Sequence, residues 1–427
     1  MKKHNVLVFP CGTEIANEII NSLEHNKHFK VKFASSEKNT YCNYRNKQID
    51  HLPYVTADSF LSDLKKIIKQ EKIRFIIPAH DDVAFALSQL EYIPGVDIIG
   101  QSGGVNEIVR FKDKTYSYFK GLLPIAAVYE KEEEVVFPFF VKPKRGQGAF
   151  NSFLLKTQKD FECFKKSFES DDFVWMEYLP GDEFTIDCFS DEGELLYAGA
   201  RTREKIARGI SVRSTLVVEE ALNSKFQKFA EIISEELELN GLWFYQMKID
   251  RNGELKLLEI GPRVSGTMML NRARGVNFVE LALFQSLGLP VEIVFNNIEV
   301  SVGRALVAKY STNIKYKNLY IDFDDTLLID EQHINTDLVK LVFQAKNEKK
   351  SVFLITKNKK QNLAHVLHRF GITNIFDGIV HLKTADKKVD FMEDNSLLVD
   401  DSFKERREVI DCGMYAFGID AVSALLK

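Results

Sequence analysis

Two carboxylates, Asp322 and Asp324, directly follow the apolar run Leu319–Ile321. A short apolar run of this kind predicts a buried strand, which then presents both carboxylates at its carboxyl end. Such a pair suits a phosphoryl transfer in which Asp322 attacks the phosphoryl group, Asp324 handles the proton and a divalent cation screens the negative charge. The chain has 427 residues, and 321 of them precede Asp322 and require a function of their own.

Length and composition indicate a globular protein of several domains. A chain of 427 residues is too long for one small core, so we expect about two to four domains. Hydrophobic residues make up 45% of the chain and charged residues 28%, which is typical of a folded protein and not of a disordered one. A net charge of −4 gives no electrostatic reason to expect a nucleic-acid partner.

The cysteines and the apolar stretches predict a cytoplasmic protein. The five cysteines are scattered and form no CxxC pair, which argues against a disulfide framework and a zinc site and suits a reducing compartment. The first apolar run ends at Pro10, so we interpret it as a strand and not as a signal peptide. No window approaches the roughly 20 apolar residues of a membrane span, and we expect no membrane partner.

Strand-like and helix-like patterns alternate in the first part of the chain. Apolar runs predict strands at 6–9, 29–34, 75–78 and 96–100, and amphipathic stretches predict helices at 14–23, 59–69 and 82–90. This alternation predicts a first α/β domain, residues 1–105, with a doubly wound parallel sheet. Gly12 follows the first strand, but no GxGxxG motif completes a dinucleotide-binding loop.

Longer strands and glycine-bearing turns characterise residues 106–312. Strands are predicted at 137–142, 152–155, 173–177, 183–189, 195–201, 242–250 and 255–260. The turns at 191–193 and 251–253 mark antiparallel hairpins. We therefore expect a second, α+β domain over 106–312, a polar linker, and a third, α/β domain over 315–427.

Two features of the second segment suit phosphate and metal chemistry. A strand ending at Lys142 leads into a basic loop with Gly146 and Gly148, where the backbone could approach a phosphate; a basic surface hairpin is the alternative. Gln246 and Glu259 lie on consecutive strands and could share a hard cation; a solvated strand face is the alternative.

A third feature is a basic stretch that includes Arg201, Arg203, Lys205, Arg208 and Arg213. It is either a solvated loop or a site for an anionic substrate or the γ-phosphate of ATP.

Together these motifs resemble the ATP-grasp superfamily, in particular the branch related to carbamoyl phosphate synthase. The resemblance implies ATP and Mg²⁺ as cofactors and a carboxylate activated as an acyl phosphate for attack by an amine or ammonia. The residues that it assigns to ATP are Lys114, Lys142, Gly146, Gly148, Glu177, Leu179 and Glu183. It assigns Mg²⁺ to Gln246 and Glu259 and places Arg263 near the transferred phosphate. Gly261 stands where the family usually has a metal-binding asparagine.

Two further apolar strands near the C-terminus also end in polar groups. The strand at 351–355 leads to Thr356, whose hydroxyl can hold a phosphate oxygen, and the strand at 396–399 leads to Asp400 and Asp401, which suit a metal ion. A lysine of the pair Lys387–Lys388 could balance the charge of the nucleophile. Surface lysines and a helix-capping aspartate pair are the alternatives.

With Asp322 and Asp324, this order resembles the haloacid dehalogenase (HAD) phosphatase superfamily. The resemblance implies Asp322 as the nucleophile that forms an aspartyl-phosphate, Asp324 as the acid/base, and Thr356 as a phosphate binder. Lys388, or alternatively Lys387, would be the catalytic lysine. The Mg²⁺ ligands that it implies are Asp322, Asp324, Asp400 and Asp401. The short gaps between the motifs imply a minimal cap domain.

The two resemblances imply a bifunctional enzyme, an ATP-dependent ligase fused to a phosphatase that acts on a substrate or product of the same pathway. Its partners would be a small-molecule carboxylate, an amine or ammonia, and a phosphorylated small molecule, and a homodimer is compatible with enzymes of this kind. Two alternatives stay open: an ATP-grasp kinase for a small molecule, and a C-terminal domain that serves only as a binding module.

Overall fold

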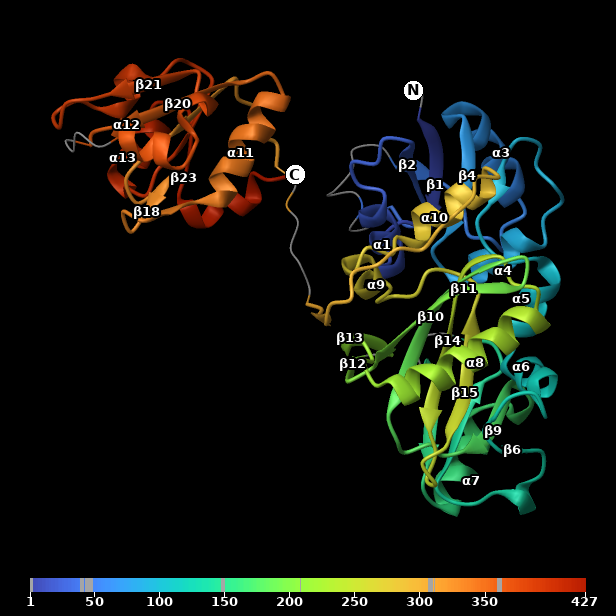
Figure 1. Cartoon of the computed structure of the whole chain (residues 1–427). Helices are drawn as coiled ribbons and strands as arrows, with labels where there is room; N and C mark the ends of the chain where they lie inside the picture. The colour runs from blue at the N-terminus through green and yellow to red at the C-terminus, as the bar shows by residue number, and fades with distance from the viewer. Residues whose placement is uncertain are drawn as a thin grey trace. The chain divides into compact units, whose positions relative to one another are not determined.

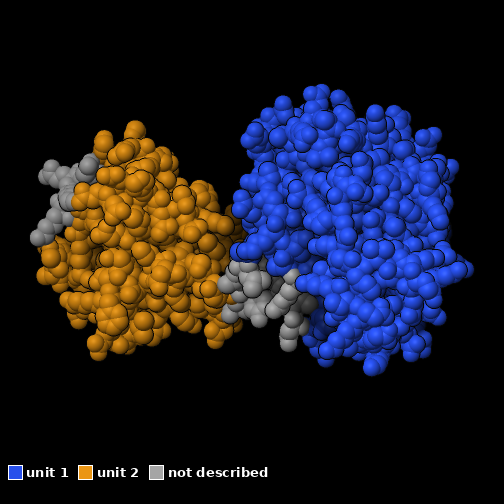
Figure 2. Space-filling model, turned by 90° about the horizontal axis from the view of Figure 1, so that it is seen from below, with its two compact units in different colours: residues 1–306 blue, residues 307–427 orange. Residues whose placement is uncertain are grey.

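The computed structural model describes residues 3–38, 42, 49–146, 150–207, 209–305, 310, 312–358 and 363–427. The chain forms two compact units, residues 1–306 (unit 1) and residues 307–427 (unit 2), which Figure 2 shows in different colours. Among the described residues, no helix has the length and apolar character needed to cross a membrane.

Unit 1 begins with the parallel sheet that the alternating pattern predicts. Its strands are β1 (His4–Phe9), β2 (Phe29–Ser35), β3 (Asp50–His51), β4 (Ile73–Pro78) and β5 (Asp97–Ile98), in the order β3-β2-β1-β4-β5. All neighbouring pairs are parallel. The connecting helices include α1 (Glu14–Ser22), α3 (Phe60–Glu71) and α4 (Asp81–Ser88), and α5 (Gly103–Val109) and α6 (Lys112–Phe119) follow the sheet (Figure 1).

Two four-stranded antiparallel sheets follow. The first has the order β6-β9-β7-β8, with β6 (Val128–Tyr129), β7 (Phe139–Pro143), β8 (Phe153–Leu155) and β9 (Phe173–Glu177). The second has the order β11-β10-β14-β15, with β10 (Glu183–Asp191), β11 (Glu194–Thr202), β14 (Gly241–Ile249) and β15 (Leu255–Gly261). Both expected hairpins are confirmed, because β10 pairs with β11 and β14 with β15 in antiparallel register.

Several elements of unit 1 were not predicted from the sequence. They are the helices α7 (Gln158–Ser167), α8 (Glu220–Glu236), α9 (Met269–Ala273) and α10 (Phe278–Ser286), and a small sheet of β12 (Lys205–Ala207), β13 (Ile210–Thr215) and β16 (Ser301–Gly303). The small sheet takes up much of the basic stretch, so that stretch is not simply a loop.

The parallel sheet and the second antiparallel sheet share one hydrophobic core. Val6 and Phe75 of the parallel sheet belong to the same buried cluster as Phe189 and Leu242 of the antiparallel sheet. Helix α10 contributes Phe278 to this cluster and lies close to the parallel sheet (Figure 1). The segments expected as a first and a second domain therefore fold together as unit 1.

Unit 2 is built on a five-stranded parallel sheet of order β21-β20-β17-β22-β23. The strands are β17 (Asn318–Ile321), β20 (Ser351–Thr356), β21 (Gly378–His381), β22 (Ser396–Val399) and β23 (Tyr415–Phe417), and the helices are α11 (Thr336–Asn347), α12 (Leu363–Arg369) and α13 (Phe403–Asp411). Between β17 and α11 lies a small hairpin, β18 (Leu328–Ile329) and β19 (His333–Ile334). Because β20, β17 and β22 are adjacent and parallel, their carboxyl ends meet at one edge.

Candidate active sites

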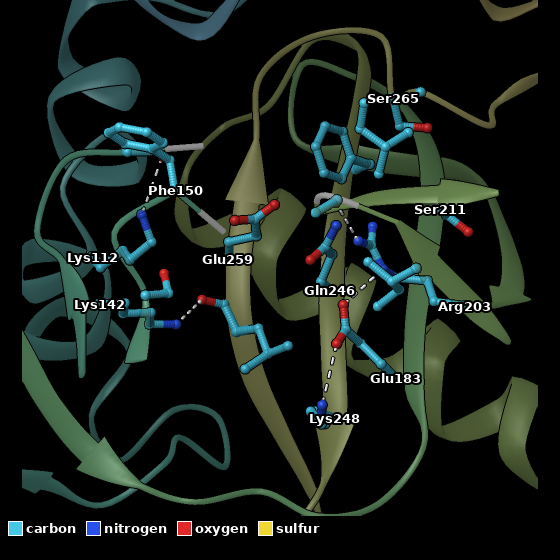
Figure 3. A pocket seen from close by; sticks show the side chains of 18 of the residues that line it. Lys112, Lys142, Phe150, Glu183, Arg203, Ser211, Gln246, Lys248, Glu259 and Ser265 are labelled. Atoms are coloured by element: carbon cyan, nitrogen blue, oxygen red, sulfur yellow. Dashed lines mark hydrogen bonds and ion pairs between the residues drawn. The ribbon is translucent and has the colours of Figure 1, made fainter. Parts of the chain in front are cut away.

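A cavity of about 280 Å³ lies in unit 1 and is lined by strands of both antiparallel sheets (Figure 3). It brings together most of the residues expected to bind ATP and Mg²⁺, and with them Arg263, which was expected near the transferred phosphate: Lys142, Gly146, Glu177, Leu179, Glu183, Gln246, Glu259 and Arg263. Gly148 lies outside the described residues. The cavity therefore unites motifs that are more than a hundred residues apart in sequence.

Lys114 does not line the cavity, and Lys112 takes the place expected for it. The Lys114 Nζ lies 2.8 Å from the Glu107 carboxylate on the exposed surface. Lys112 lines the cavity, and its Nζ donates a hydrogen bond to the Gly146 carbonyl at 3.2 Å. Helix α6 begins at Lys112, and residues two positions apart on a helix point in different directions, so the two lysines cannot both face the cavity.

Lys142 is a buried lysine that has no carboxylate within ion-pair distance among the described residues. Its Nζ donates to the Leu258 carbonyl at 3.4 Å and lies 5.2 Å from the centroid of the Tyr116 ring. Burial, helped by the charge of Lys112, lowers the pKa of Lys142 to about 7 against the opposing effect of Glu259. Near neutral pH its amino group is therefore only partly charged until an anion binds beside it.

Gln246 and Glu259 are direct cross-strand partners on β14 and β15, and both point into the cavity (Figure 3). The register shifts immediately after Gln246, which marks a β-bulge at this point. Within the described part of the chain, neither side chain makes a hydrogen bond or an ion pair. Two uncommitted oxygen-bearing side chains on adjacent strands fit a divalent cation that takes its other ligands from a nucleotide and water.

Phe244 occupies the space that a third metal-ligating side chain would need. It is the cross-strand partner of Gly261, and a Cβ added at Gly261 would lie 2.2 Å from its ring. The Arg263 guanidinium lies 5.4 Å from the centroid of the same ring. The glycine at this position is therefore required by its aromatic neighbour, and a cation held by Gln246 and Glu259 would have one protein ligand fewer than the resemblance implies.

We expect Gly261→Asn to lower the free energy of unfolding by about 1–3 kcal/mol, because the new side chain overlaps the Phe244 ring. Chemical denaturation measures this change. Gly253→Asn is the matched control: Gly253 lies in the β14–β15 turn with φ +84° and nothing within 4 Å of an added Cβ, and asparagine tolerates such a backbone. Equal losses in the two variants would contradict the steric explanation, and Phe244→Ala should relieve the loss in the double variant.

Arg263 reaches the cavity but its charge is already balanced. Its Nε and Nη2 donate to the Asp81 carboxylate at 2.6 and 2.7 Å, and its Nη1 donates to the Val264 carbonyl at 2.9 Å. Asp81 is the first residue of α4, so the parallel sheet positions this arginine from 182 residues away. Sequence reasoning missed Asp81, because nothing local connects it to Arg263.

Glu183 and Glu177, which the resemblance assigns to ATP binding, are both held by protein partners. The Glu183 carboxylate lies 2.7 Å from Arg203 Nε and 3.4 Å from Lys248 Nζ (Figure 3). Glu177 Oε1 accepts a hydrogen bond from the Ala127 amide at 2.9 Å. Arg203 and Lys248 therefore both lie within ion-pair distance of this partly buried carboxylate.

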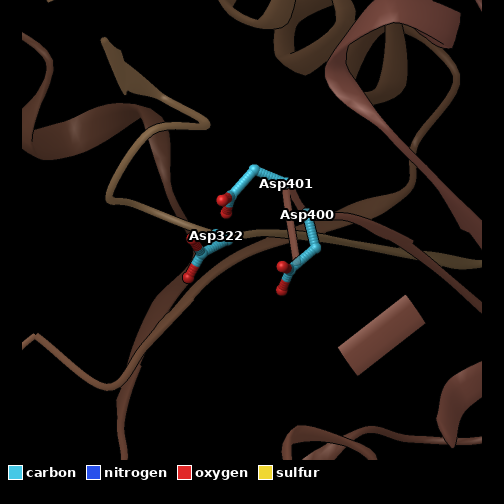
Figure 4. Close-up of side chains that lie close together, drawn as sticks. All are labelled: Asp322, Asp400 and Asp401. Carbon is cyan, nitrogen blue, oxygen red and sulfur yellow. The ribbon is translucent and has the colours of Figure 1, made fainter. Parts of the chain in front are cut away.

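In unit 2, three carboxylates cluster at the carboxyl edge of the sheet. Asp322 follows β17, and Asp400 and Asp401 follow β22; each offers an oxygen within 4.8 Å of the others (Figure 4). Carboxylate oxygens without nitrogen or sulfur ligands suit Mg²⁺ and related hard cations. This set agrees with the expected metal ligands except for Asp324, whose carboxylate lies outside the group of three.

Lys388, and not the exposed Lys387, reaches this cluster. Its buried Nζ donates to Asp322 Oδ1 and, at 2.6 Å, to Asp400 Oδ2. Burial raises the pKa of Asp322 to about 7 although Lys388 lowers it, and Asp400 adds to the rise. Burial alone would lower the pKa of Lys388, but the two carboxylates outweigh it and the pKa is raised. The lysine therefore stays charged between them.

Thr356 and Asp324 meet through a residue that the sequence did not single out. Thr356 ends β20, fully buried, and its hydroxyl accepts a hydrogen bond from the Asn358 amide at 2.9 Å. The Asn358 side chain donates to Asp324 Oδ1 at 3.0 Å. Asp325, next to Asp324, has φ +49°, a left-handed backbone conformation that favours glycine. Asn358 thus positions Asp324, the expected acid/base.

Comparisons with known proteins bear on unit 1. A family model described as "ATP-grasp in the biosynthetic pathway with Ter operon" matches residues 169–305. No protein with curated annotation matches the sequence significantly. Among solved structures, a biotin carboxylase–β,γ-ATP complex from Campylobacter jejuni is similar with a TM-score of 0.55 and 13% identity, over 68% of this chain and 72% of that one.

Two further similar structures have other activities. One is an N5-carboxyaminoimidazole ribonucleotide synthetase in complex with ADP, with a TM-score of 0.57 and 15% identity over 70% of this chain and 80% of that one. The other is an L-amino acid ligase from Bacillus licheniformis, with a TM-score of 0.52 and 18% identity over 68% and 76%. At these identities the similarity shows a shared mixed α/β fold and nothing about substrates.

Proposed function

We propose that this chain, which contains an ATP-grasp domain, binds ATP with Mg²⁺ in the cavity of unit 1 and activates a carboxylate for attack by an amine or ammonia. The observation that carries this proposal is the convergence of the half-buried Lys112 and the buried Lys142 with the uncommitted oxygens of Gln246 and Glu259 in one cavity. A bound cation would bridge and neutralise the phosphate oxygens. Similar structures contain ATP, an ATP analogue or ADP, which supports the nucleotide.

Different residues of the cavity lining suit different parts of a nucleotide. Phe140, Met176, Leu179 and Leu258 supply an apolar surface that suits a purine base. The lysines sit where they can pair with phosphate oxygens, so much of the rate enhancement would come from positioning and charge neutralisation. The carboxylate would be converted to an acyl phosphate, and the amine would displace that phosphate.

A screen of acid and amine pairs for ADP formation, with the product masses measured, tests this proposal. ADP that appears only when both partners are present, with a product lighter than the two together by one water, supports a ligase. ADP release that needs no amine and leaves a stable phosphorylated product would instead show a small-molecule kinase. Absence of ATP binding in direct titration would contradict both.

We expect ATP affinity to fall as the pH rises above neutrality, by up to about tenfold per pH unit. The free protein holds Lys142 with a pKa of about 7, so above that pH the amino group must take up a proton when phosphates bind. Calorimetric titration between pH 7.5 and 9 avoids the ionisation of ATP itself, whose last phosphate pKa is about 6.

Two variants decide whether Lys142 causes this dependence. Lys142→Arg keeps its charge at all these pH values and should flatten the profile. Lys144→Arg, at an exposed lysine beside Asp113 and outside the cavity lining, is the matched control and should keep it. A profile that stays steep in Lys142→Arg would contradict the assignment.

We also propose that unit 2 is a HAD-like phosphatase with at most a minimal cap. The observation that carries this proposal is the buried Lys388 between Asp322 and Asp400, with Asp401 completing a three-carboxylate group. A cation held by this group would screen the charge of an incoming phosphate ester. The hairpin β18–β19 is the only strand pair between β17 and α11, all of which the structure describes, so little covers the site from this side.

Each step of phosphate-ester hydrolysis can be assigned to particular residues of unit 2. An oxygen of Asp322 forms a bond to phosphorus while the bond to the leaving oxygen breaks, and Asp324 gives that oxygen its proton. Thr356 and Lys388 hold the phosphoryl oxygens. Asp324 then takes a proton from the water that hydrolyses the aspartyl-phosphate. Hydrolysis of p-nitrophenyl phosphate with Mg²⁺ tests this function, and failure on this and other phosphate esters would favour a binding module.

A further inference from the structure

The cavity of unit 1 extends to a region that the proposed nucleotide contacts do not use. In Figure 3, Lys112 and Lys142 stand on one side of Glu259, and Ser211 and Ser265 stand on the other. This second region, called here the far end, is lined by Glu14, Arg201, Ser211, Ser265, Thr267 and Arg304. These residues come from α1, β11, β13 and the segments after β15 and β16, so the far end combines a helix that follows the first strand of the parallel sheet with parts of the second antiparallel sheet and of the small sheet.

Arg201 lines the far end and has one donor that is not used within the described protein. It is 1% exposed, and its Nε and Nη2 donate to Asp187 at 2.8 and 3.2 Å, with a further bond from Nη2 to Ser265 Oγ at 2.8 Å. Its Nη1 is buried and has no hydrogen-bond partner among the described residues. Leaving a buried guanidinium N–H unpaired is costly, so a ligand that supplies an anionic oxygen would be favoured here.

Arg304 adds a positive charge that no carboxylate neutralises directly. Its Nη1 donates to the Ser211 carbonyl at 3.2 Å, and within the described ranges no carboxylate lies at ion-pair distance from it. Burial lowers the pKa of Arg304, and the nearby charge of Arg201 lowers it further. Two guanidinium groups in the lining of one cavity, close enough for one to lower the pKa of the other, favour binding of an anion, and their planar shape suits a carboxylate.

Glu14 brings the opposite charge to the same region. It is the first residue of α1, and its carboxylate makes no hydrogen bond or ion pair with any described side chain, although its charge raises the pKa of both Arg263 and Arg304. The far end therefore contains a carboxylate, that of Glu14, and a guanidinium, that of Arg304, which do not form an ion pair with each other. A ligand that carries both charges would satisfy both.

We infer that the far end binds a zwitterion, an α-amino acid or a close analogue, with its carboxylate between Arg201 Nη1 and Arg304 and its ammonium group against Glu14. The inference rests on the proposed function, because this compound would be one of the two partners that the ATP site joins. The inference specifies the chemical class of this one substrate and says nothing about the other.

The experiment titrates the full-length chain with the twenty common L-amino acids. For each ligand that binds, the des-amino acid and the α-amide are titrated as well, all with and without a non-hydrolysable ATP analogue and Mg²⁺. We expect at least one amino acid to bind, and both of its analogues to bind at least tenfold more weakly. Arg304→Gln should lose at least tenfold in affinity, and Glu14→Gln should lose the preference for the amino acid over the des-amino acid.

Controls separate a binding role from a folding defect. Arg213→Gln removes an exposed arginine on β13, outside the cavity lining, and should leave amino-acid affinity unchanged, whereas Arg304→Lys should restore part of what Arg304→Gln loses. Equal binding of amino acid and des-amino acid, or equal losses in Arg304→Gln and Arg213→Gln, would overturn the inference. Nucleotide binding without any amino-acid binding overturns the inference alone, and absence of nucleotide binding overturns the proposed ATP site.

Discussion

Asp322→Asn should reduce phosphate-ester hydrolysis by at least about 10⁴-fold, because the loss of a covalent nucleophile is among the largest effects of a single residue in an enzyme. Asparagine keeps the size of the side chain and can still accept a hydrogen bond from Lys388, so the buried cluster should stay folded. Initial rates with p-nitrophenyl phosphate at saturating Mg²⁺ measure the change.

The neighbouring Asp325→Asn is the matched control. Asp325 is exposed with φ +49°, a conformation that asparagine also tolerates, so this variant should keep most of the activity. Similar rates in the two variants would show that Asp322 is not the nucleophile. If the two units act in one pathway, Asp322→Asn protein given ATP and both ligase partners should accumulate a phosphorylated compound that the unmodified protein removes; an unchanged product profile would contradict that coupling.

Glu259→Gln should lower ATP-dependent turnover by about 10²–10³-fold, comparable to the loss of one electrostatic contact to a developing charge. The substitution keeps the shape and the cross-strand pairing with Gln246 but removes the only negative charge of the pair. Because the Phe244 ring leaves no room for a side chain at Gly261, that position cannot supply a replacement carboxylate.

Rates of ADP formation across a range of Mg²⁺ concentrations measure this effect, and we expect the half-saturating Mg²⁺ concentration to rise as the turnover falls. Glu254→Gln, at an exposed position just before β15, is the matched control. Identical Mg²⁺ dependence in Glu259→Gln and the unmodified protein would remove Glu259 from the metal site.

The sequence predicted the features that depend on local pattern and strand order. An apolar run followed by a polar group places that group at the edge of a parallel sheet, which is why Asp322, Thr356 and Asp400 were expected together. The hairpin turn at 251–253 likewise sets Gln246 near Glu259, since hairpin partners follow from the turn. In both cases the position of the residue follows from the strand or turn next to it in sequence.

Features that depend on distant contacts were not predicted. The motif Phe111–Lys114 contains two lysines, and only the start of α6 decides that Lys112 faces the cavity. Arg201 was expected in a basic stretch, but it is buried, and Asp187 on the neighbouring strand balances its charge. The side-chain role of Asn358 depends on how the loop after β20 folds back toward Asp324. The partners in the last two examples are more than a dozen residues apart in sequence, so no local pattern predicts their contact.

The hydrophobic core that joins the parallel sheet to the second antiparallel sheet limits how this protein can be divided. Val6 and Phe278 belong to one buried cluster, and Asp81 of α4 holds Arg263 at the cavity. A fragment starting near residue 106 would expose that apolar surface to water and leave a buried guanidinium without its counter-ion. Residues 106–306 are therefore not a separable unit: any truncation or recombination that is to keep the cavity of unit 1 must also keep the first hundred residues.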